Sequence, residues 1–183
     1  MKPKELSLWV KDEDNGLRKT KVIEDIVFDV QYKPKDFQVA NYYKKAELSK
    51  TEYEAVHEKY EDLHFFDLKI SVNDPLQKDI TRYQVANNEE WQERLYYLSF
   101  PMQHDIKLVE GRDTIPCALY HFERSYDVAD HRTFVLAFAK QENQSDHLPK
   151  TLIIDSPVFR TGPVKLKFSE SALKNLPGLK LAS

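Results

Sequence analysis

The sequence predicts an α+β fold in which an antiparallel β-sheet or sandwich carries helices inserted between its early and late strands. Apolar residues alternate with polar ones from 25 to 32 and from 65 to 72, which is the pattern of half-buried strands. Helix-period patterns fill the segment between those strands and return near 88–98. From 105 to 168 the alternation resumes in short runs separated by polar turns. These observations predict sheet, helices and sheet again.

Composition predicts a single domain covering residues 1–183. The chain has 183 residues, of which 41% are hydrophobic and 31% charged. Domains usually contain about 50–250 residues, so one hydrophobic core is expected. The apolar content also separates the chain from disordered proteins.

The first 23 residues are expected to form a hairpin. Leu6, Trp9 and Val10 suit a strand, and Asn15-Gly16 is typical of a tight turn. The run 17–23 then provides the second strand of this hairpin.

The following segment alternates between strand and helix patterns. Ile26, Phe28 and Val30 place one face of a strand in the core. Pro34 suits the first turn of a helix, where its missing N–H costs nothing, and Phe37 continues the helical spacing.

A capping box marks the clearest helix start. Ser49 and Glu52 stand three residues apart, as the two members of this motif do. The residues that follow at helical spacing are Tyr53, Val56, His57, Tyr60 and Leu63. A strand is then expected over 65–72.

Two further helices are predicted before the late strands. Asp74-Pro75 resembles a helix start, and Leu76 and Ile80 continue its pattern. Asn88 can cap a second helix, and Pro101 is expected to end it.

Five strands and a short helix complete the prediction. The strands are expected at 105–109, 115–126, 133–140, 151–154 and 164–168, and the helix at 169–176. Cys117 is the only cysteine, so no disulfide forms within the chain, and its apolar neighbours predict a buried structural thiol.

Charge and glycine content argue against several functional classes. The formal net charge is -3, and no segment supplies the basic patch that nucleic-acid binding requires, so no nucleic acid is expected. Four glycines provide no phosphate-binding loop of the usual kinds, and we expect no cofactor. No window holds the roughly 20 apolar residues of a membrane span.

The densest cluster of polar groups is a weak candidate for a metal site. On a strand, His121 and Glu123 lie on one face, and the following turn can bring His131 toward them. The alternate face carries Ala118, Tyr120 and Phe122, so the histidine and the glutamate fall where a half-buried sheet meets water. We therefore favour a solvated face, and we predict neither catalytic nor metal-binding residues.

Aromatic pairs provide the candidate partner surface. The chain contains ten Tyr and ten Phe, with adjacent pairs at Tyr42-Tyr43 and Tyr96-Tyr97. Neighbouring residues on a one-sided element seldom both face the core, so one ring of each pair should lie near the surface. Exposed aromatic rings are enriched where proteins bind each other, and these four tyrosines are the predicted partner-binding residues.

Three segments resemble uncharacterised envelope lipoproteins of Gram-negative bacteria. They are residues 30–34 (VQYKP), 121–126 (HFERSY) and 162–167 (GPVKLK). In such lipoproteins an acylated cysteine precedes the mature domain. The resemblance therefore implies contact with the membrane only through a lipid anchor, which is absent from this chain, and location in the cell envelope. It implies no activity, and the cytoplasm is the alternative location.

The function expected from these observations is non-enzymatic. We predict a binding or assembly module of the cell envelope that contacts a protein partner through its aromatic surface. The alternatives are a hydrolase-type enzyme built around His121, Glu123 and His131, and a carbohydrate-binding module.

Overall fold

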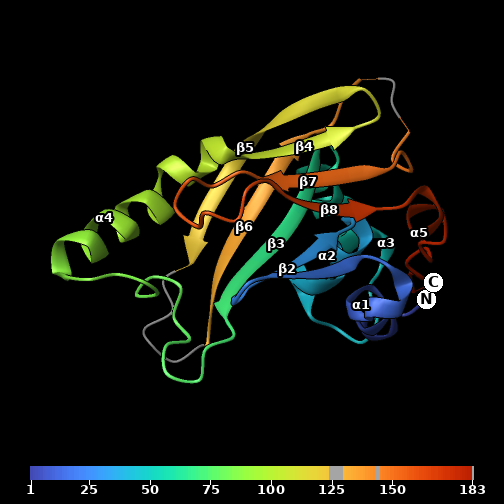
Figure 1. Ribbon diagram of the computed structural model, residues 1–183. Coiled ribbons are helices and arrows are strands. Elements are labelled where there is room, and N and C mark those ends of the chain that lie inside the picture. The colour runs from blue at the N-terminus through green and yellow to red at the C-terminus, as the bar shows by residue number, and fades with distance from the viewer. Residues whose placement is uncertain (124–129, 143–144, 183) are drawn as a thin grey trace.

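One curved sheet organises the molecule. The structure, a computed structural model, describes residues 1–123, 130–142 and 145–182. Eight strands pair antiparallel in the order β1-β2-β3-β6-β5-β4-β7-β8 (Figure 1). They are β1 (Arg18–Ile23), β2 (Ile26–Lys33), β3 (Leu63–Val72), β4 (Ile106–Glu110), β5 (Asp113–Glu123), β6 (His131–Ala139), β7 (Lys150–Ile154) and β8 (Val164–Phe168). The predicted α+β class with an antiparallel sheet is confirmed.

Each strand from β2 to β8 contributes buried side chains to the interior, whereas β1 contains none. Phe28 and Val30 of β2 are fully buried, and they pair across the sheet with Ile70 and Leu68 of β3. The strands predicted at 25–32 and 65–72 are therefore present in the predicted orientation.

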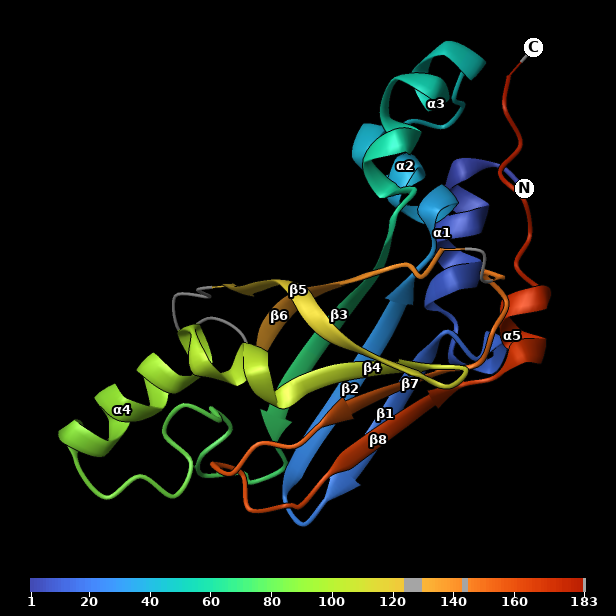
Figure 2. The same ribbon diagram turned by 90° about the horizontal axis from the view of Figure 1, so that it is seen from above.

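The sheet curves until its edge strands approach each other. β1 and β8 are the two edge strands of the sheet, and the curvature brings them side by side (Figures 1 and 2). Inside the curve, the ring of Phe66 lies 5.0 Å from that of Tyr32, 5.7 Å from that of Phe138 and 5.5 Å from that of Phe168. Early and late strands thus pack on the same core, and the late strands continue the sheet instead of forming one half of a sandwich.

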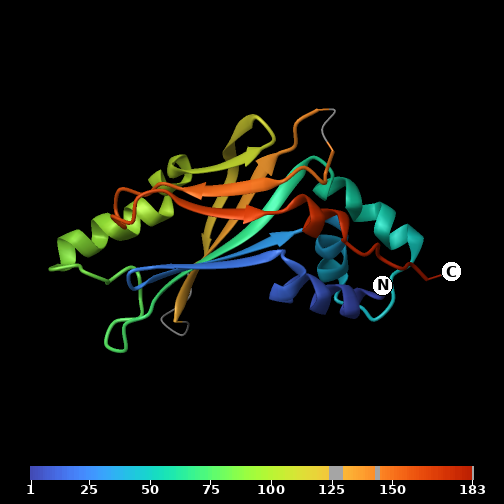
Figure 3. The same ribbon diagram turned by 45° about the vertical axis from the view of Figure 1, so that its right-hand side comes forward.

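The helices gather at the ends of the sheet. They are α1 (Pro3–Lys11), α2 (Lys35–Tyr43), α3 (Lys50–His57), α4 (Asn88–Ser99) and α5 (Glu170–Lys174). α4 projects from one end, and the other four lie at the opposite end (Figures 2 and 3). Within the described ranges, no helix is both long and apolar enough to cross a membrane.

The capping box forms as predicted. The Ser49 hydroxyl accepts the Glu52 N–H at 3.2 Å, and the Glu52 carboxylate accepts the Ser49 N–H at 3.0 Å. The helix ends earlier than its apolar pattern suggests, because Leu63 already belongs to β3.

The predicted amino-terminal hairpin is wrong. Residues 3–11 form α1, in which Pro3, Leu6 and Val10 are buried on one side at helical spacing. Pro3 occupies the first turn, where it is well tolerated. The first hairpin of the sheet is β1–β2, which turns at Glu24 and Asp25.

The helix predicted from Asp74-Pro75 is also wrong, because local side-chain bonds replace it. The Asp74 carboxylate accepts the Leu76 N–H at 2.8 Å, and the Asp79 carboxylate accepts the Thr81 N–H at 3.0 Å. Such bonds compete with the helical pattern. Ile80 is buried although Leu76 is 94% exposed, so these two residues do not share an apolar face.

A β-bulge changes which face of β5 is buried. Cys117 pairs with Phe138 and Leu119 pairs with Ala137, which leaves Ala118 as an extra residue. Cys117 therefore points inward, as predicted for a buried thiol, and Tyr120 also packs inward after the bulge. The end of the strand predicted at 115–126 lies outside the described residues from 124 onward.

Four side chains form a polar network in the core: Tyr32, His64, Glu110 and Lys150. Each is at most 5% exposed. Glu110 Oε1 lies 2.7 Å from Lys150 Nζ and 3.1 Å from His64 Nε2, and Glu110 Oε2 is hydrogen-bonded to the same nitrogen of His64 at 3.3 Å. The hydroxyl of Tyr32 lies 3.3 Å from His64 Nδ1. The network therefore joins β2, β3, β4 and β7 across the interior.

The charges in this network compensate each other. Burial raises the pKa of Glu110, but the contacts with His64 and Lys150 outweigh it and hold that pKa at about 2. Burial lowers the pKa of Lys150 and of His64, and the attraction to Glu110 opposes both shifts. Glu110 is therefore ionised and His64 neutral at neutral pH.

Substitution of Gly16 should destabilise the fold more than substitution of Gly162. Both have positive φ (+77° and +66°), but a Cβ at Gly16 would lie 3.0 Å from the Cβ of Ala172, whereas a Cβ at Gly162 meets nothing within 4 Å. The strained backbone conformation should lower the free energy of unfolding of each Gly→Ala variant by about 1–2 kcal/mol. Gly16→Ala should lose more stability, because its new Cβ also crowds Ala172. Urea denaturation measures the difference, and adding Ala172→Gly should remove it in a double-mutant cycle. Equal losses in the two single variants would contradict this account.

Replacing Glu110 by Gln should destabilise the protein by about 3–5 kcal/mol, because it leaves Lys150 buried without its counter-charge. Glu110→Gln/Lys150→Met should be less destabilised than Glu110→Gln alone. Chemical denaturation of both variants provides the test. A double variant that is less stable than the single one would rule out compensation between these two charges.

Stability should also fall in acid. The unfolded chain protonates Glu110 near its ordinary pKa of 4.5, whereas the folded chain protonates it near about 2. The contribution is therefore complete above pH 4.5 and is lost as the pH falls through about 2, and a lowering of the pKa by this amount corresponds to roughly 3 kcal/mol. The pKa of His64 is also lowered in the folded protein, so His64 contributes a further loss of stability as the pH falls below 6.5. Unfolding free energies measured from pH 7 to 2 should show a steeper decline for the natural chain than for Glu110→Gln.

Candidate functional site

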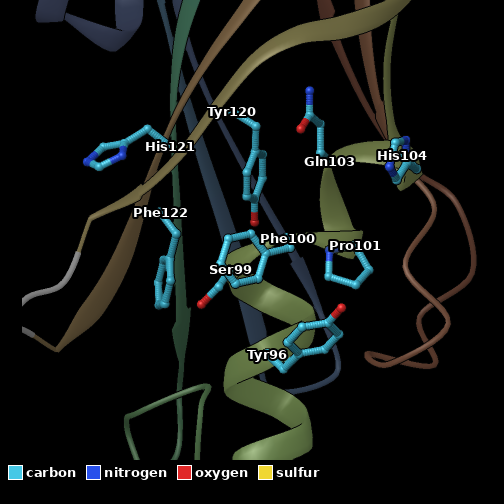
Figure 4. Close-up of a pocket in the computed structure, with 9 residues that line it drawn as sticks. All are labelled: Tyr96, Ser99, Phe100, Pro101, Gln103, His104, Tyr120, His121 and Phe122. Carbon is cyan, nitrogen blue, oxygen red and sulfur yellow. The ribbon is translucent and has the colours of Figure 1, made fainter.

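An open aromatic pocket lies where α4 meets β5. Its volume is about 560 Å³. The lining residues are Tyr96, Ser99, Phe100, Pro101, Gln103, His104, Tyr120, His121 and Phe122 (Figure 4). We call this site the aromatic pocket.

The end of α4 presents two aromatic rings at the pocket. Tyr96 and Phe100 stand four residues apart, their ring centroids are 5.7 Å apart, and each residue is 63% exposed. The helix stops at Ser99 because Phe100 precedes Pro101, and a residue before proline disfavours the helical conformation. The chain therefore turns directly below these rings.

Strand β5 provides the opposite wall. The rings of Tyr120 and Phe122 lie 5.8 and 4.9 Å from that of the buried Phe134, which anchors them to the core. Figure 4 shows both side chains directed toward the end of α4, whereas His121 points away from them. Because Tyr120 follows the bulge at Ala118, this orientation depends on the extra residue.

Two hydrogen bonds hold the walls together. The Tyr120 hydroxyl donates to the main-chain carbonyl of Leu98 in α4. The Gln103 amide donates to the carbonyl of Cys117 at 2.9 Å, which ties the 3₁₀ helix Pro101–Asp105 to β5. The pocket is thus built from three segments that are fixed to one another before a ligand binds.

Burial controls the ionisation of the groups around the pocket. It raises the pKa of the Tyr120 hydroxyl, and it raises the pKa of the Cys117 thiol to about 11 despite hydrogen bonds that favour the thiolate. Both groups are therefore protonated at neutral pH, and the thiol is not activated as a nucleophile. The pocket suits contact and hydrogen bonding.

The predicted tyrosine pairs are divided between surface and interior. Tyr96 is 63% exposed, whereas Tyr97 is half-buried and its hydroxyl donates to Asp105 at 2.7 Å. Tyr42 is 54% exposed, whereas Tyr43 packs against a small cluster at the helical end of the molecule. The two pairs lie at opposite ends of the sheet, because α2 and α4 do (Figure 2). The structure therefore does not combine them into one surface.

The weak candidates for a metal site share the outward face of the sheet. Glu123 pairs with Thr133, and His131 lies two residues before Thr133 on β6, on the same side. His121 and Glu123 are exposed. Burial and the nearby Lys69 lower the pKa of His131. Across the described part of the chain, no three His, Cys, Asp or Glu side chains are grouped closely enough to hold a metal ion.

Sequence reasoning missed most of the pocket. Phe100, Tyr120 and Phe122 were not predicted to meet, and the last two were expected only as core residues. The available signal was the spacing of Tyr96 and Phe100, which places two large rings on one side of the last helical turn.

No family model, curated protein or solved structure matches this chain. The pocket geometry is therefore the principal guide to function.

Proposed function

We propose that this protein is a non-enzymatic binding or assembly module of the cell envelope that holds a protein partner at the aromatic pocket. The observation that carries this proposal is the paired exposure of Tyr96 and Phe100 at an open pocket. Large aromatic side chains that remain in water without a structural role are typical of interaction surfaces. The envelope location rests on the resemblance of three sequence segments to envelope lipoproteins.

The pocket supports the proposal through its rigidity. Rings anchored on Phe134 lose little conformational freedom when a partner binds, so more of the contact energy is available as affinity. Aromatic residues set in such pockets commonly dominate protein interfaces.

A carbohydrate partner is the second candidate. Gln103 and His104 place polar groups beside the exposed rings. Aromatic rings combined with polar groups are also found in the pockets that bind small ligands. A sugar ring and a partner side chain would use the same rings, so the experiment must separate the two.

The variant Tyr96→Ala/Phe100→Ala should lose its partner. Loss of an aromatic hot spot weakens binding by about 2 kcal/mol or more, which corresponds to roughly 30-fold. The tagged full-length chain and this variant would each be purified gently from the native organism, and co-purifying proteins quantified by mass spectrometry. We expect a stoichiometric envelope protein with the natural chain and a depletion of at least tenfold with the variant.

The matched control is Tyr42→Ala, which removes a comparably exposed ring from the other end of the molecule. It should retain the partner, and the thermal unfolding of all three proteins should be similar. Equal recovery with the double variant and the control would reject the aromatic pocket as the partner site. Binding of the purified chain to a glycan panel, lost in the double variant, would replace the protein partner by a carbohydrate.

A further inference from the structure

The outward face of β4, β7 and β8 has an unbalanced charge. Lys107 of β4 and Lys165 and Lys167 of β8 are exposed there. Among the described residues, no acidic side chain lies within ion-pair distance of any of these three lysines. The other outward positions of these strands are Val109, Thr151 and Ile153, so the face contains no carboxylate. We call these three residues the lysine face.

Two outward cations in the opposite half of the sheet are paired with acids. Arg18 lies 2.7 Å from Asp29, and Lys33 lies 3.0 Å from Asp67, so these outward cations have partners on neighbouring strands. The whole chain carries a net charge of -3. The lysine face therefore has the opposite sign to the protein as a whole.

Protection of a sheet edge explains only part of this pattern. Lysines on an edge strand discourage pairing with other molecules, and β8 is an edge strand. Lys107, however, lies on β4, which is paired on both sides by β5 and β7. Its charge has no edge to protect.

The register fixes the spacing of the charges. Ile153 of β7 pairs with Lys107 on one side and with Lys165 on the other. Neighbouring strands are about 4.8 Å apart, so the backbones of these lysines are roughly 10 Å apart, and Lys165 and Lys167 are about 7 Å apart along one strand. Cations spread over such distances on the outside of a curved sheet suit an extended anionic surface better than a single small anion.

The surroundings of the lysine face are open. No helix lies over β7 and β8 in Figures 1 and 3. The acids nearest to these strands in sequence are Asp105, which precedes β4 and accepts the Tyr97 hydroxyl, and Asp155, which follows β7. Ile153, half-buried between two lysines, adds an apolar group at the centre.

We propose that the lysine face binds the anionic surface of a phospholipid membrane. The face has no aromatic ring on which a nucleic-acid base could stack. Lysine stems can lie along the apolar surface while their ammonium groups contact headgroup phosphates. This inference is independent of the proposed function, because the lysine face and the aromatic pocket share no residue.

The expected affinity is modest and depends on salt. A lysine near an anionic membrane contributes about 5-fold in binding, which corresponds to about 1 kcal/mol, so three contribute roughly 100-fold. Screening should weaken binding as the Debye length falls to about 8 Å at physiological ionic strength.

Sedimentation with vesicles tests the proposal on the full-length chain. The natural chain should bind phosphatidylcholine vesicles that contain phosphatidylglycerol and should not bind vesicles of phosphatidylcholine alone. The variant Lys107→Gln/Lys165→Gln/Lys167→Gln should lose roughly 100-fold in partitioning at low salt. The control Lys4→Gln/Lys59→Gln/Lys69→Gln changes the net charge equally at exposed positions elsewhere, and it should lose only a few-fold.

Each contrary result would overturn the proposal. Equal losses in the two triple variants would mean that net charge, not the lysine face, governs binding. No preference for phosphatidylglycerol would exclude an anionic membrane. Polyglutamate or RNA could instead displace the protein from intact vesicles and bind it more tightly than the vesicles do. Such a result with polyglutamate would assign the face to an acidic protein, and with RNA to a nucleic acid.

Discussion

The carboxylate of Glu110 is the constraint around which the interior is built. A buried charge of this kind is tolerated only when other groups replace the water it has lost. Lys150 stands directly opposite on β7, and His64 comes from β3 across the interior. Strands on different walls of the curved sheet must therefore keep their relative positions, because a shift of one would leave a charge without compensation. This requirement limits the ways in which the apolar residues around it can pack.

The curvature of the sheet also determines where the aromatic pocket forms. Tyr120 and Phe122 rest on the core residue Phe134, so their positions follow from the packing of the interior. The end of α4 is in turn bonded to Tyr120 through the Leu98 carbonyl. Leu98 is the one buried residue of α4, and the neighbouring Tyr97 packs against the core. The surface rings of the pocket are thus positioned by contacts that begin in the interior.

Local patterns predicted local structure well and distant contacts poorly. The alternation in β2 and β3 and the capping box at Ser49 depend on neighbouring residues, and the sequence was sufficient for them. Leu6, Trp9 and Val10 were interpreted as a strand because their residue types suit it, although Leu6 and Val10 stand four residues apart, as residues on one face of a helix do. The helix expected after Asp74 depended on whether Asp79 would bond to Thr81 and Arg132, and Arg132 lies on a distant strand. The pocket required the bulge at Ala118, which no alternation rule identifies.

The strand order has a consequence for how this protein can vary. β3 and β6 are neighbours in the sheet, but the chain between them leaves the sheet after Val72 and returns to it as β4 and β5, on the far side of β6. The segment from 73 to 105, which includes α4, is the part of this connection that lies outside the sheet. Loop closure depends only weakly on loop length, so insertions at the exposed positions of this segment cost the sheet little, whereas Ile80, Leu98 and Met102 are buried in the core. The two exposed rings of the aromatic pocket belong to this segment, and related chains could change what they recognise while keeping the same interior.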